Sequence, residues 1–273
     1  MKRKIYVITG STSGIGNALL RALAQDNTVF AGYRNEKYVE ELKQISENII
    51  PFYIDMEKEE SILQASEFIR SKVDKIDTLI NVAGCVIAGV MENLSVENIR
   101  KQFEVNTFSH LEFTQKLIDK LNGGKIINIS SMASFGIFPF VAPYCASKRA
   151  LDILFNSMMI ESGVKVVSIK PGVIATPLWD KSIQLNQDAI ANAKNYDKQM
   201  QYMVANAKKN GEKGLSVNKV VDLIIKVDAM KNPKPSYTVG KDAKVAEIIS
   251  KLPFNIQNKL IKLGLKLKLR SFA

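Results

Sequence analysis

The stretch that decides the fold lies near the N-terminus and reads Ile5-Tyr6-Val7-Ile8-Thr9-Gly10-Ser11-Thr12-Ser13-Gly14-Ile15-Gly16. Its four apolar residues before Thr9 are typical of a buried strand, and a helical pattern from Ala18 to Leu23 follows the last glycine. Glycines at 10, 14 and 16 let the backbone turn tightly and present amide groups at a helix N-terminus, where the helix dipole favours a phosphate. A strand before the loop and a helix after it predict a dinucleotide site more strongly than three glycines alone.

The rest of the chain alternates short β-branched runs with longer helical patterns, which is typical of successive βαβ units. We therefore predict an α/β fold of Rossmann type, with a doubly wound parallel sheet and a C-terminal helical extension. The predicted strands cover residues 4–9, 28–33, 49–54, 78–82, 125–130, 165–170 and 236–239. The predicted helices cover residues 15–25, 36–46, 58–73, 95–120, 143–161 and 216–229. Because the crossovers are right-handed, every loop that follows a strand should lie at one edge of the sheet, where ligands of such folds bind.

Length and composition agree with a single core. The 273 residues suit one doubly wound domain with an appendage, and we expect a dinucleotide-binding domain at 1–240 and a basic amphipathic extension at 241–273. Apolar residues at 46% and charged residues at 24% argue against disorder. No apolar run resembles a signal peptide or approaches the roughly 20 residues that cross a bilayer, so we expect a cytoplasmic protein.

The charge is concentrated in the tail. The chain carries a net +11, and residues 241–273 alone contain eight Lys or Arg and two acidic residues. Because the excess is a property of the tail and not of the domain, we expect no nucleic-acid partner. Cys85 and Cys145 lie far apart without a metal-binding spacing, so we expect free thiols and no metal.

The glycine spacing T-G-x-x-x-G-x-G differs from the more widespread G-x-G-x-x-G and resembles that of the short-chain dehydrogenase/reductase family. Asn81-Val82-Ala83-Gly84 is similar to the family's Asn-Asn-Ala-Gly element, with Val82 in place of the second Asn. Further family positions occur in order across about residues 4–240: Asp55 at the adenine contact, then Asn106, Ser131, Tyr144, Lys148 and Pro171-Gly172. The resemblance implies an oxidoreductase that moves a hydride between a nicotinamide cofactor and an alcohol, ketone or aldehyde.

The end of the second strand, Tyr33-Arg34-Asn35, bears on the choice of cofactor. An NAD enzyme places an Asp or Glu there to bind the ribose 2′-hydroxyl, and none occurs at 33–35. Arg34 instead offers a charge-assisted contact to the 2′-phosphate of NADP. We expect NADP(H) in preference to NAD; the alternatives are a solvated surface Arg34 and a ribose contact from Glu36.

Tyr144 and Lys148 are the candidate catalytic pair. The spacing Y-x-x-x-K occurs three times, but only Tyr144 begins a well-patterned helix after a strand that ends near Ser131. Lys148 lies one turn along on the same face, and its charge, with that of the nicotinamide, should favour the phenolate of a side chain whose ordinary pKa is near 10. Tyr144 would then give a proton to a carbonyl in reduction, or take one from an alcohol in oxidation.

The resemblance assigns the remaining site residues. Ser131 matches the family's substrate-orienting serine, with Ser130 as its competitor, and Asn106 matches the residue that holds a water on the proton path, with an ordinary helical Asn as the alternative. Val173 and Thr176, after Pro171-Gly172, resemble the nicotinamide clamp. The expected cofactor contacts are Gly10, Ser11, Thr12, Ser13, Gly14, Ile15, Gly16, Arg34, Asp55, Asn81, Ala83, Gly84, Tyr144, Lys148, Pro171, Gly172, Val173 and Thr176. His110, the single histidine, has no motif partner and is interpreted as structural.

Apolar residues around the expected reaction centre favour a small hydrophobic carbonyl or alcohol as substrate, with core packing as the rival explanation. Thr-Pro-Leu-Trp at 176–179 and the extended C-terminus resemble the branch that contains hydroxysteroid and retinol dehydrogenases. The polar segment 177–214 has weak periodicity and is interpreted as a lid, or else as a surface excursion.

In the tail, Lys259, Lys262, Lys266 and Arg270 recur at helical spacings beside an apolar stripe. Residues 255–270 therefore either contact an anionic membrane surface or dock on the domain with a solvated basic face. Two other functions stay open: a keto-lipid or ketoacyl reductase with a longer cleft, and a non-catalytic NADP-binding sensor or scaffold. We also expect a homo-oligomer.

Overall fold

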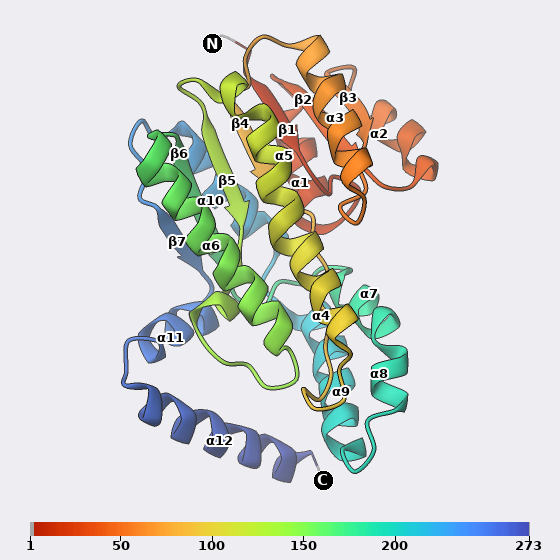
Figure 1. The fold of residues 1–273 in the computed structure, drawn as a ribbon, viewed down its shortest axis with the longest axis vertical. Coiled ribbons are helices and arrows are strands. Elements are labelled where there is room, and N and C mark those ends of the chain that lie inside the picture. The colour runs from red at the N-terminus through yellow and green to blue at the C-terminus, as the bar shows by residue number, and fades with distance from the viewer. Residues whose placement is uncertain (1–2, 273) are drawn as a thin grey trace.

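The computed structural model describes residues 3–272 and contains one seven-stranded parallel sheet of order β3-β2-β1-β4-β5-β6-β7 (Figure 1). The strands are β1 (Ile5–Ile8), β2 (Thr28–Tyr33), β3 (Ile49–Tyr53), β4 (Thr78–Asn81), β5 (Lys125–Ile129), β6 (Lys165–Pro171) and β7 (Ser236–Val239). Strands are added outward from β1 on one side and from β4 on the other, so the sheet is doubly wound. The predicted fold class and all seven predicted strands are confirmed.

Helices cover both faces of the sheet and bury a separate apolar layer on each. One face carries α1 (Gly14–Leu23), α2 (Val39–Ile45) and α10 (Val217–Ala229), and the other carries α3 (Glu59–Lys72), α5 (Ser109–Leu117) and α6 (Ala142–Ser162). Side chains alternate between the two layers along each strand: in β1, Tyr6 and Ile8 pack with the first layer and Val7 with the second. This two-sided burial explains why the strands read as continuous apolar runs.

Two predicted helices differ in detail from the structure. The helix predicted at 95–120 is divided into α4 (Val96–Phe103), a π-helical turn η2 (Glu104–Phe108), α5 and a short 3-10 turn η3 (Ile118–Leu121). The one predicted at 36–46 begins with a 3-10 turn η1 (Glu36–Tyr38) before α2. Another 3-10 turn, η4 (Met132–Phe135), follows β5.

The segment between β6 and α10 is more regular than the sequence suggests. It forms α7 (Leu178–Leu185), α8 (Gln187–Ala191) and α9 (Asp197–Lys213), none of which was predicted. Ser182 is the one buried residue of α7 and Met200 the one buried residue of α9. The many Asn, Gln and Lys residues of this segment favour a loop and obscure the apolar face that α7 and α9 each carry, so the sequence does not predict these helices.

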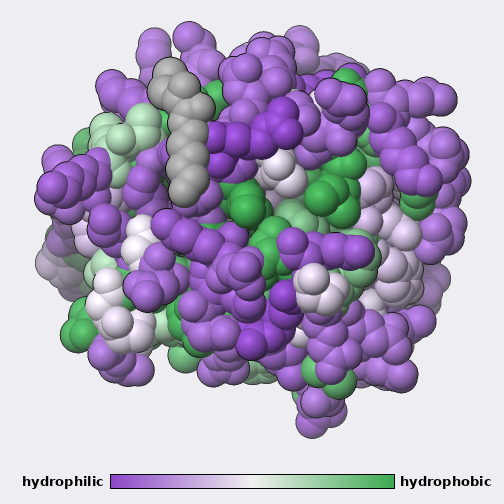
Figure 2. Space-filling model, turned by 90° about the horizontal axis from the view of Figure 1, so that it is seen from above, coloured by the Kyte–Doolittle hydropathy of each residue, from purple (hydrophilic) through white to green (hydrophobic). Residues whose placement is uncertain are grey.

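The C-terminal extension forms α11 (Lys241–Ile249) and α12 (Phe254–Ser271). In Figure 1 the strand arrows point toward the end of the molecule that carries α7, α9, α11 and α12. The opposite end, seen in Figure 2, is covered mainly by hydrophilic residues, with apolar residues only in small groups. Within residues 3–272, no helix combines the length and apolarity that crossing a membrane requires.

Candidate active site

A cleft of about 1370 Å³ lies at the carboxyl edge of the sheet. Its walls come from the glycine loop, the segments after β2, β4, β5 and β6, the first turns of α6, and helices α7, α9, α11 and α12. All the loops that follow the inner strands therefore meet at one site, as the right-handed crossovers predict.

The glycine loop has a shape that side chains would block. Gly10 and Gly14 adopt positive φ angles of +67° and +54°. A Cβ on Gly10 would lie 2.9 Å from the backbone of Ala83, and one on Gly16 would lie 2.2 Å from the Gly10 carbonyl oxygen. The loop can thus turn tightly over the start of α1 and leave a concave surface of backbone, which fits the phosphates of a dinucleotide.

Most of the loop residues expected to contact the cofactor line the cleft: Gly10, Thr12, Ser13, Gly14 and Ile15. Ser11 and Gly16 do not line it. The hydroxyl of Ser11 is buried and donates to the Ile8 carbonyl at 2.9 Å, so this side chain holds the turn closed. Gly16 lies beneath the loop, where it leaves room for the Gly10 carbonyl.

The segment after β4 meets the expectation in part. Val82, Ala83 and Gly84 line the cleft, and Thr9 ties them to the glycine loop because its hydroxyl accepts from the amides of Val82 (2.9 Å) and Ala83 (3.2 Å). Asn81 does not line the cleft, because its amide is buried and donates to Asn128 Oδ1 at 2.8 Å, and its expected contact with the cofactor stays a prediction.

Asp55 also lies behind the cleft wall, which Ile54, Met56 and Glu57 form instead. Its carboxylate is turned toward its own chain and accepts from the Glu57 amide at 3.1 Å. The adenine contact expected from Asp55 stays a prediction, which would require its carboxylate to turn toward the cleft.

His110 supports the segment after β4 from below. Its Nε2 lies 2.8 Å from the Ala83 carbonyl oxygen, and burial lowers the pKa of the ring to about 3. The imidazole is therefore neutral at physiological pH and donates through Nε2, which agrees with a structural role.

Arg34 lies at one end of the cleft, on the exposed end of β2. Its guanidinium is 67% exposed and pairs with Glu57 at 3.2 Å, and Lys101 of α4 pairs with the other oxygen of Glu57 at 2.8 Å. All three side chains line the cleft. The trio carries a net positive charge, so this end of the cleft favours an anion. Glu36 is absent from the lining and instead accepts from the Tyr33 hydroxyl at 3.4 Å.

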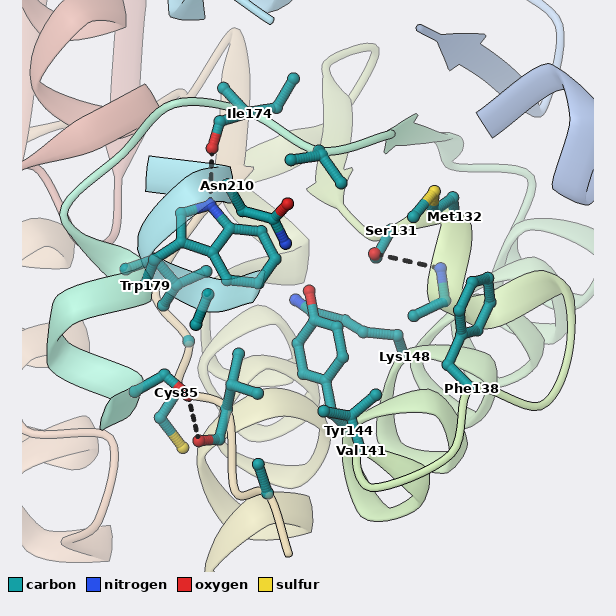
Figure 3. Close-up of a pocket in the computed structure, with 18 of the residues that line it drawn as sticks. Cys85, Ser131, Met132, Phe138, Val141, Tyr144, Lys148, Ile174, Trp179 and Asn210 are labelled. Carbon is teal, nitrogen blue, oxygen red and sulfur yellow. Dashed lines mark hydrogen bonds between the residues drawn. The ribbon is translucent and has the colours of Figure 1, made fainter. Parts of the chain in front are cut away.

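Ser131, Tyr144 and Lys148 converge at the centre of the cleft (Figure 3). The Tyr144 hydroxyl points into the pocket, with Ser131 on one side and Trp179 and Asn210 on the other. Ser131 directly follows Ser130 at the end of β5, and its hydroxyl accepts from the Ala133 amide at 3.1 Å, which fixes its direction. Tyr144 and Lys148 stand one turn apart in α6, and the Lys148 ammonium lies 6.0 Å from the centre of the phenol ring.

The electrostatics of this pair differ from the sequence-based expectation. Burial raises the pKa of Tyr144 to about 12, although hydrogen bonding with Ser131 opposes the rise. Burial lowers the pKa of Lys148 to about 8, and its ammonium donates to the Ile129 carbonyl at 2.8 Å. In this structure the phenol is thus stabilised in its protonated form, because loss of solvent outweighs any nearby positive charge.

Asn106 is fully buried in the π-helical turn and does not line the cleft. Its amide oxygen accepts from the Cys85 amide at 3.0 Å, and its amide nitrogen donates to the Cys85 carbonyl and to Ser147 Oγ. A Cβ on Gly84 would lie 3.2 Å from Asn106 Oδ1 and 3.7 Å from Lys148 Nζ. The amide oxygen and the ammonium therefore border the same small space beside Gly84.

The segment after β6 forms another wall, with Pro171, Gly172, Val173 and Thr176 all in the lining. Asp242, in the first turn of α11, accepts from the Val173 amide at 2.6 Å. A Cβ on Gly172 would lie 2.0 Å from Asp242 Oδ1, so glycine is needed at this contact. The C-terminal extension is thereby joined directly to the expected nicotinamide clamp.

Segment 177–214, which we name the lid segment, is anchored at its base and along one side. At the base, the Ala175 amide donates to the Leu215 carbonyl at 3.0 Å and the Leu215 amide donates to the Val173 carbonyl at 2.8 Å. A Cβ on Gly214 would lie 2.4 Å from the Ala175 amide nitrogen. Along the side, buried Asn186 accepts from the Ala88 amide and donates to the Val86 carbonyl, both at 2.8 Å. These contacts hold α7 against the loop after β4.

Several cleft residues escaped sequence reasoning. Lys181 and Asn210 come from the lid segment, Asp242 from α11, and the face Ile261, Gly264, Leu265 and Lys268 from α12. None of them belongs to a local motif, so only the fold reveals their place. Within the described residues 3–272, no group of three or more His, Cys, Asp or Glu gathers in a way that would hold a metal ion.

Comparison with known proteins agrees with this geometry. The model of the short chain dehydrogenase family matches residues 4–187. An oxidoreductase of Bacillus subtilis, YusZ, is 30% identical over 96% of this chain and 98% of its own. The NADPH-dependent 3-dehydrocapnine reductase of Ornithobacterium rhinotracheale is 34% identical over 64% of this chain and 67% of its own.

Solved structures share the fold. A short chain dehydrogenase of Burkholderia cenocepacia in complex with NADP has a TM-score of 0.71 at 24% identity, covering 95% of this chain and 98% of its own. A short chain dehydrogenase/reductase of Burkholderia phymatum in complex with NAD has a TM-score of 0.74 at 18% identity, covering 90% and 92%. Structural neighbours thus include proteins with either dinucleotide.

Proposed function

Since the chain belongs to the short-chain dehydrogenase/reductase family and is an oxidoreductase, we propose that it reduces a hydrophobic ketone or aldehyde with NADPH, with Tyr144 as the proton donor. The observation that carries the proposal is the convergence of Ser131, Tyr144 and Lys148 in the same cleft as the glycine loop. A sensor or scaffold would have no need of a buried proton donor facing its ligand cleft, which argues against the non-catalytic alternative.

The chemistry follows from the state of each side chain. When bound, NADPH supplies the hydride for the carbonyl carbon. Ser131 is directed by the Ala133 amide and donates to the carbonyl oxygen, which steadies the charge that develops there. Tyr144, neutral because of burial, gives its proton to the same oxygen. The Lys148 ammonium then stabilises the phenolate, and the space shared with Asn106 beside Gly84 offers a path for the replacing proton.

The preference for NADPH is supported by the charges at the end of β2. Arg34 and Lys101 share a single carboxylate, so one positive charge there is left to attract a 2′-phosphate. The name of the Ornithobacterium relative specifies NADPH. Arg34→Leu is expected to weaken NADPH binding by about 10-fold and to leave NADH binding nearly unchanged. Equal losses for both cofactors, measured by calorimetry, would remove Arg34 from the 2′-phosphate site.

The test of activity is NADPH oxidation across steroid, retinoid, aromatic and keto-lipid carbonyls, with Tyr144→Phe beside the parent. The parent should turn over at least one class. Tyr144→Phe should lose at least about 100-fold in rate while still binding NADPH, because general acid catalysis commonly contributes that much. NADPH binding without Tyr144-dependent turnover of any carbonyl would favour the sensor.

A keto-lipid reductase is favoured as a second candidate by the length of the cleft. The cleft does not end near Tyr144 but continues to α12, where Ile261, Gly264 and Leu265 line it. An apolar wall this far from the proton donor suits a long acyl chain better than a compact carbonyl. In the panel, a KM that falls with chain length would support this candidate.

We also propose that α12 rests on an anionic lipid surface. Residues 261, 264, 265 and 268 face the cleft, whereas Ile256, Leu260, Leu263 and Leu267 form a separate stripe whose exposed fractions are 40% to 55%. Six basic residues and no acidic one occur from Lys251 to Arg270. An exposed apolar stripe in a segment that contains basic but no acidic residues is complementary to a bilayer with anionic headgroups. The hydroxysteroid and retinol branch, the cytoplasmic location and the homo-oligomer stay predictions from the sequence.

A further inference from the structure

We infer that Lys181 of the lid segment binds the pyrophosphate of the cofactor and couples closure of that segment to dinucleotide binding. Its ammonium donates to the Ser13 hydroxyl at 2.9 Å, across 168 residues of sequence. Both side chains line the cleft, and Ser13 is the residue that precedes α1 in the glycine loop. The lid segment thus contacts the glycine loop through a positively charged side chain. The inference rests on the proposed function, because it requires a dinucleotide in the cleft.

The glycine loop supplies no cation of its own. Residues 9–17 contain no Lys or Arg, so the loop offers a pyrophosphate only backbone amides, hydroxyls and the dipole of α1. Those groups carry partial charges, whereas a pyrophosphate that bridges two ribosyl groups carries two full negative charges. A mobile ammonium at the loop would supply a full opposing charge.

The other positively charged side chains of the cleft lie away from the glycine loop and interact with other groups. Arg34 and Lys101 pair with Glu57 at the far end of β2, and Lys148 donates to the Ile129 carbonyl in the reaction centre. Lys268 lies on α12. Lys181 is exposed and takes part in none of the ion pairs found among residues 3–272. It is therefore the cleft cation best placed to exchange a neutral partner, the Ser13 hydroxyl, for a phosphate oxygen.

The surrounding contacts keep Lys181 near the loop. Asn186, a little over one turn along α7, is hydrogen-bonded to the loop after β4. The side chain of Thr176, which directly precedes the lid segment, lies 3.4 Å from the position of a Cβ on Gly14. These neutral contacts position the helix, and the single charged contact responds to the ligand. Binding of the dinucleotide would thus strengthen the contact between lid and loop, and release would have to break it.

The decisive measurement is calorimetric binding of both NADPH and NADH to the full chain and to three variants. Lys181→Met should weaken both dinucleotides by the same factor, about 10-fold, because both contain the pyrophosphate. Lys181→Arg should restore most of the affinity. Lys209→Met is the matched control: it removes the same charge from an exposed position of α9 that does not line the cleft, and it should leave binding unchanged.

Salt gives an independent readout. The affinity of the parent should fall with ionic strength more steeply than that of Lys181→Met, because the variant has lost one charge at the phosphates. Fluorescence of Trp179, the single tryptophan, reports directly on α7 and should change on NADPH addition less in Lys181→Met than in the parent.

Three results would overturn the inference while leaving the proposed function intact: unchanged binding in a folded Lys181→Met, equal losses in Lys181→Met and Lys209→Met, or a loss confined to NADPH, which would place Lys181 at the 2′-phosphate. Failure of the parent to bind either dinucleotide would refute the proposed function and this inference together. The two failures are therefore distinguishable.

Discussion

At the scale of single residues, burial decides the chemistry of the reaction centre. A spacing of four on a helix correctly places Lys148 beside Tyr144, but spacing says nothing about solvent. Loss of solvent raises the pKa of Tyr144 to about 12 and lowers that of Lys148 to about 8. The pair is consequently suited to give a proton, which is the step that reduction requires.

A pH profile should expose this arrangement. Reduction needs a protonated Tyr144, which persists to about pH 12, and a charged Lys148, which is lost as the pH rises through about 8. The rate constant for carbonyl reduction should therefore fall above about pH 8, whereas that for alcohol oxidation, which needs the phenolate beside the charged ammonium, should rise up to about pH 8 and then level off. Steady-state rates measured in both directions from about pH 6 to about pH 10 check this. A reduction rate that climbs over the alkaline range would contradict the assignment of Tyr144 as the acid.

His110 offers a test of stability that is separate from activity. Its pKa is about 3 in the folded chain against an ordinary 6.5, so the unfolded chain binds the proton more readily between these values. The free energy of unfolding should therefore decrease as the pH falls from 6.5 toward 3. His110→Gln, which keeps a donor for the Ala83 carbonyl, should show a shallower loss of the free energy of unfolding between about pH 7 and about pH 5. Identical slopes for parent and variant would show that His110 does not titrate with unfolding.

At the scale of elements, the lid segment depends on a buried amide. Asn186 satisfies the Ala88 amide, which would be left without a partner in Asn186→Ala, and the Val86 carbonyl, which would keep only the longer bond from the Ser182 hydroxyl at 3.3 Å. Each buried group that loses its partner costs about 1 to 3 kcal/mol, so we expect the lid segment to open without global unfolding. Limited proteolysis should cut the variant first within 177–214, and its substrate KM should rise. An exposed control, Asn192→Ala, should behave like the parent.

The strands could be predicted from the sequence, whereas several of the helices could not. The inner strands could be predicted because they are buried on both faces and are mostly apolar, whereas the edge strand β7, which is exposed or half-buried, could be predicted only from its β-branched residues and its place after a helical pattern. The division of the helix predicted at 95–120 could not, since it depends on Asn106 reaching Cys85 and Ser147 from distant segments. The helices of the lid segment were missed because the segment is rich in Asn, Gln and Lys, which favour a loop, although α7 and α9 each carry an apolar face.

At the scale of the whole molecule, the C-terminal extension joins the cleft to the surface. Asp242 accepts a hydrogen bond from the Val173 amide and α12 lines the far end of the cleft, so the extension predicted at 241–273 contributes to the site itself. The motif residues Ser131, Tyr144 and Lys148 could be located from sequence because their spacing is local. Lys181, Asp242 and the α12 face could not, because only the folded chain brings them to the cleft.

Lipid binding by α12 can be tested with the full chain. Co-sedimentation with vesicles that contain anionic lipid should exceed that with purely zwitterionic vesicles, since the cations of α12 attract anionic headgroups. The triple variant Lys259→Glu, Lys262→Glu and Lys266→Glu should abolish the difference. The triple variant Lys208→Glu, Lys209→Glu and Lys213→Glu, on the exposed side of α9, makes the same change in net charge and is the control. Equal sedimentation with both kinds of vesicle, or an unaltered triple variant, would leave α12 as a solvated helix at the mouth of the cleft.

The most direct test of the central claim follows a deuterium atom from NADPH labelled at the transferred position to the product alcohol. With any carbonyl that the parent consumes, mass spectrometry should find one deuterium on the carbinol carbon, and Tyr144→Phe, with NADPH still bound, should give almost no labelled alcohol. Unlabelled alcohol from the parent, or undiminished labelled product from Tyr144→Phe, would contradict a hydride transfer completed by the proton of Tyr144.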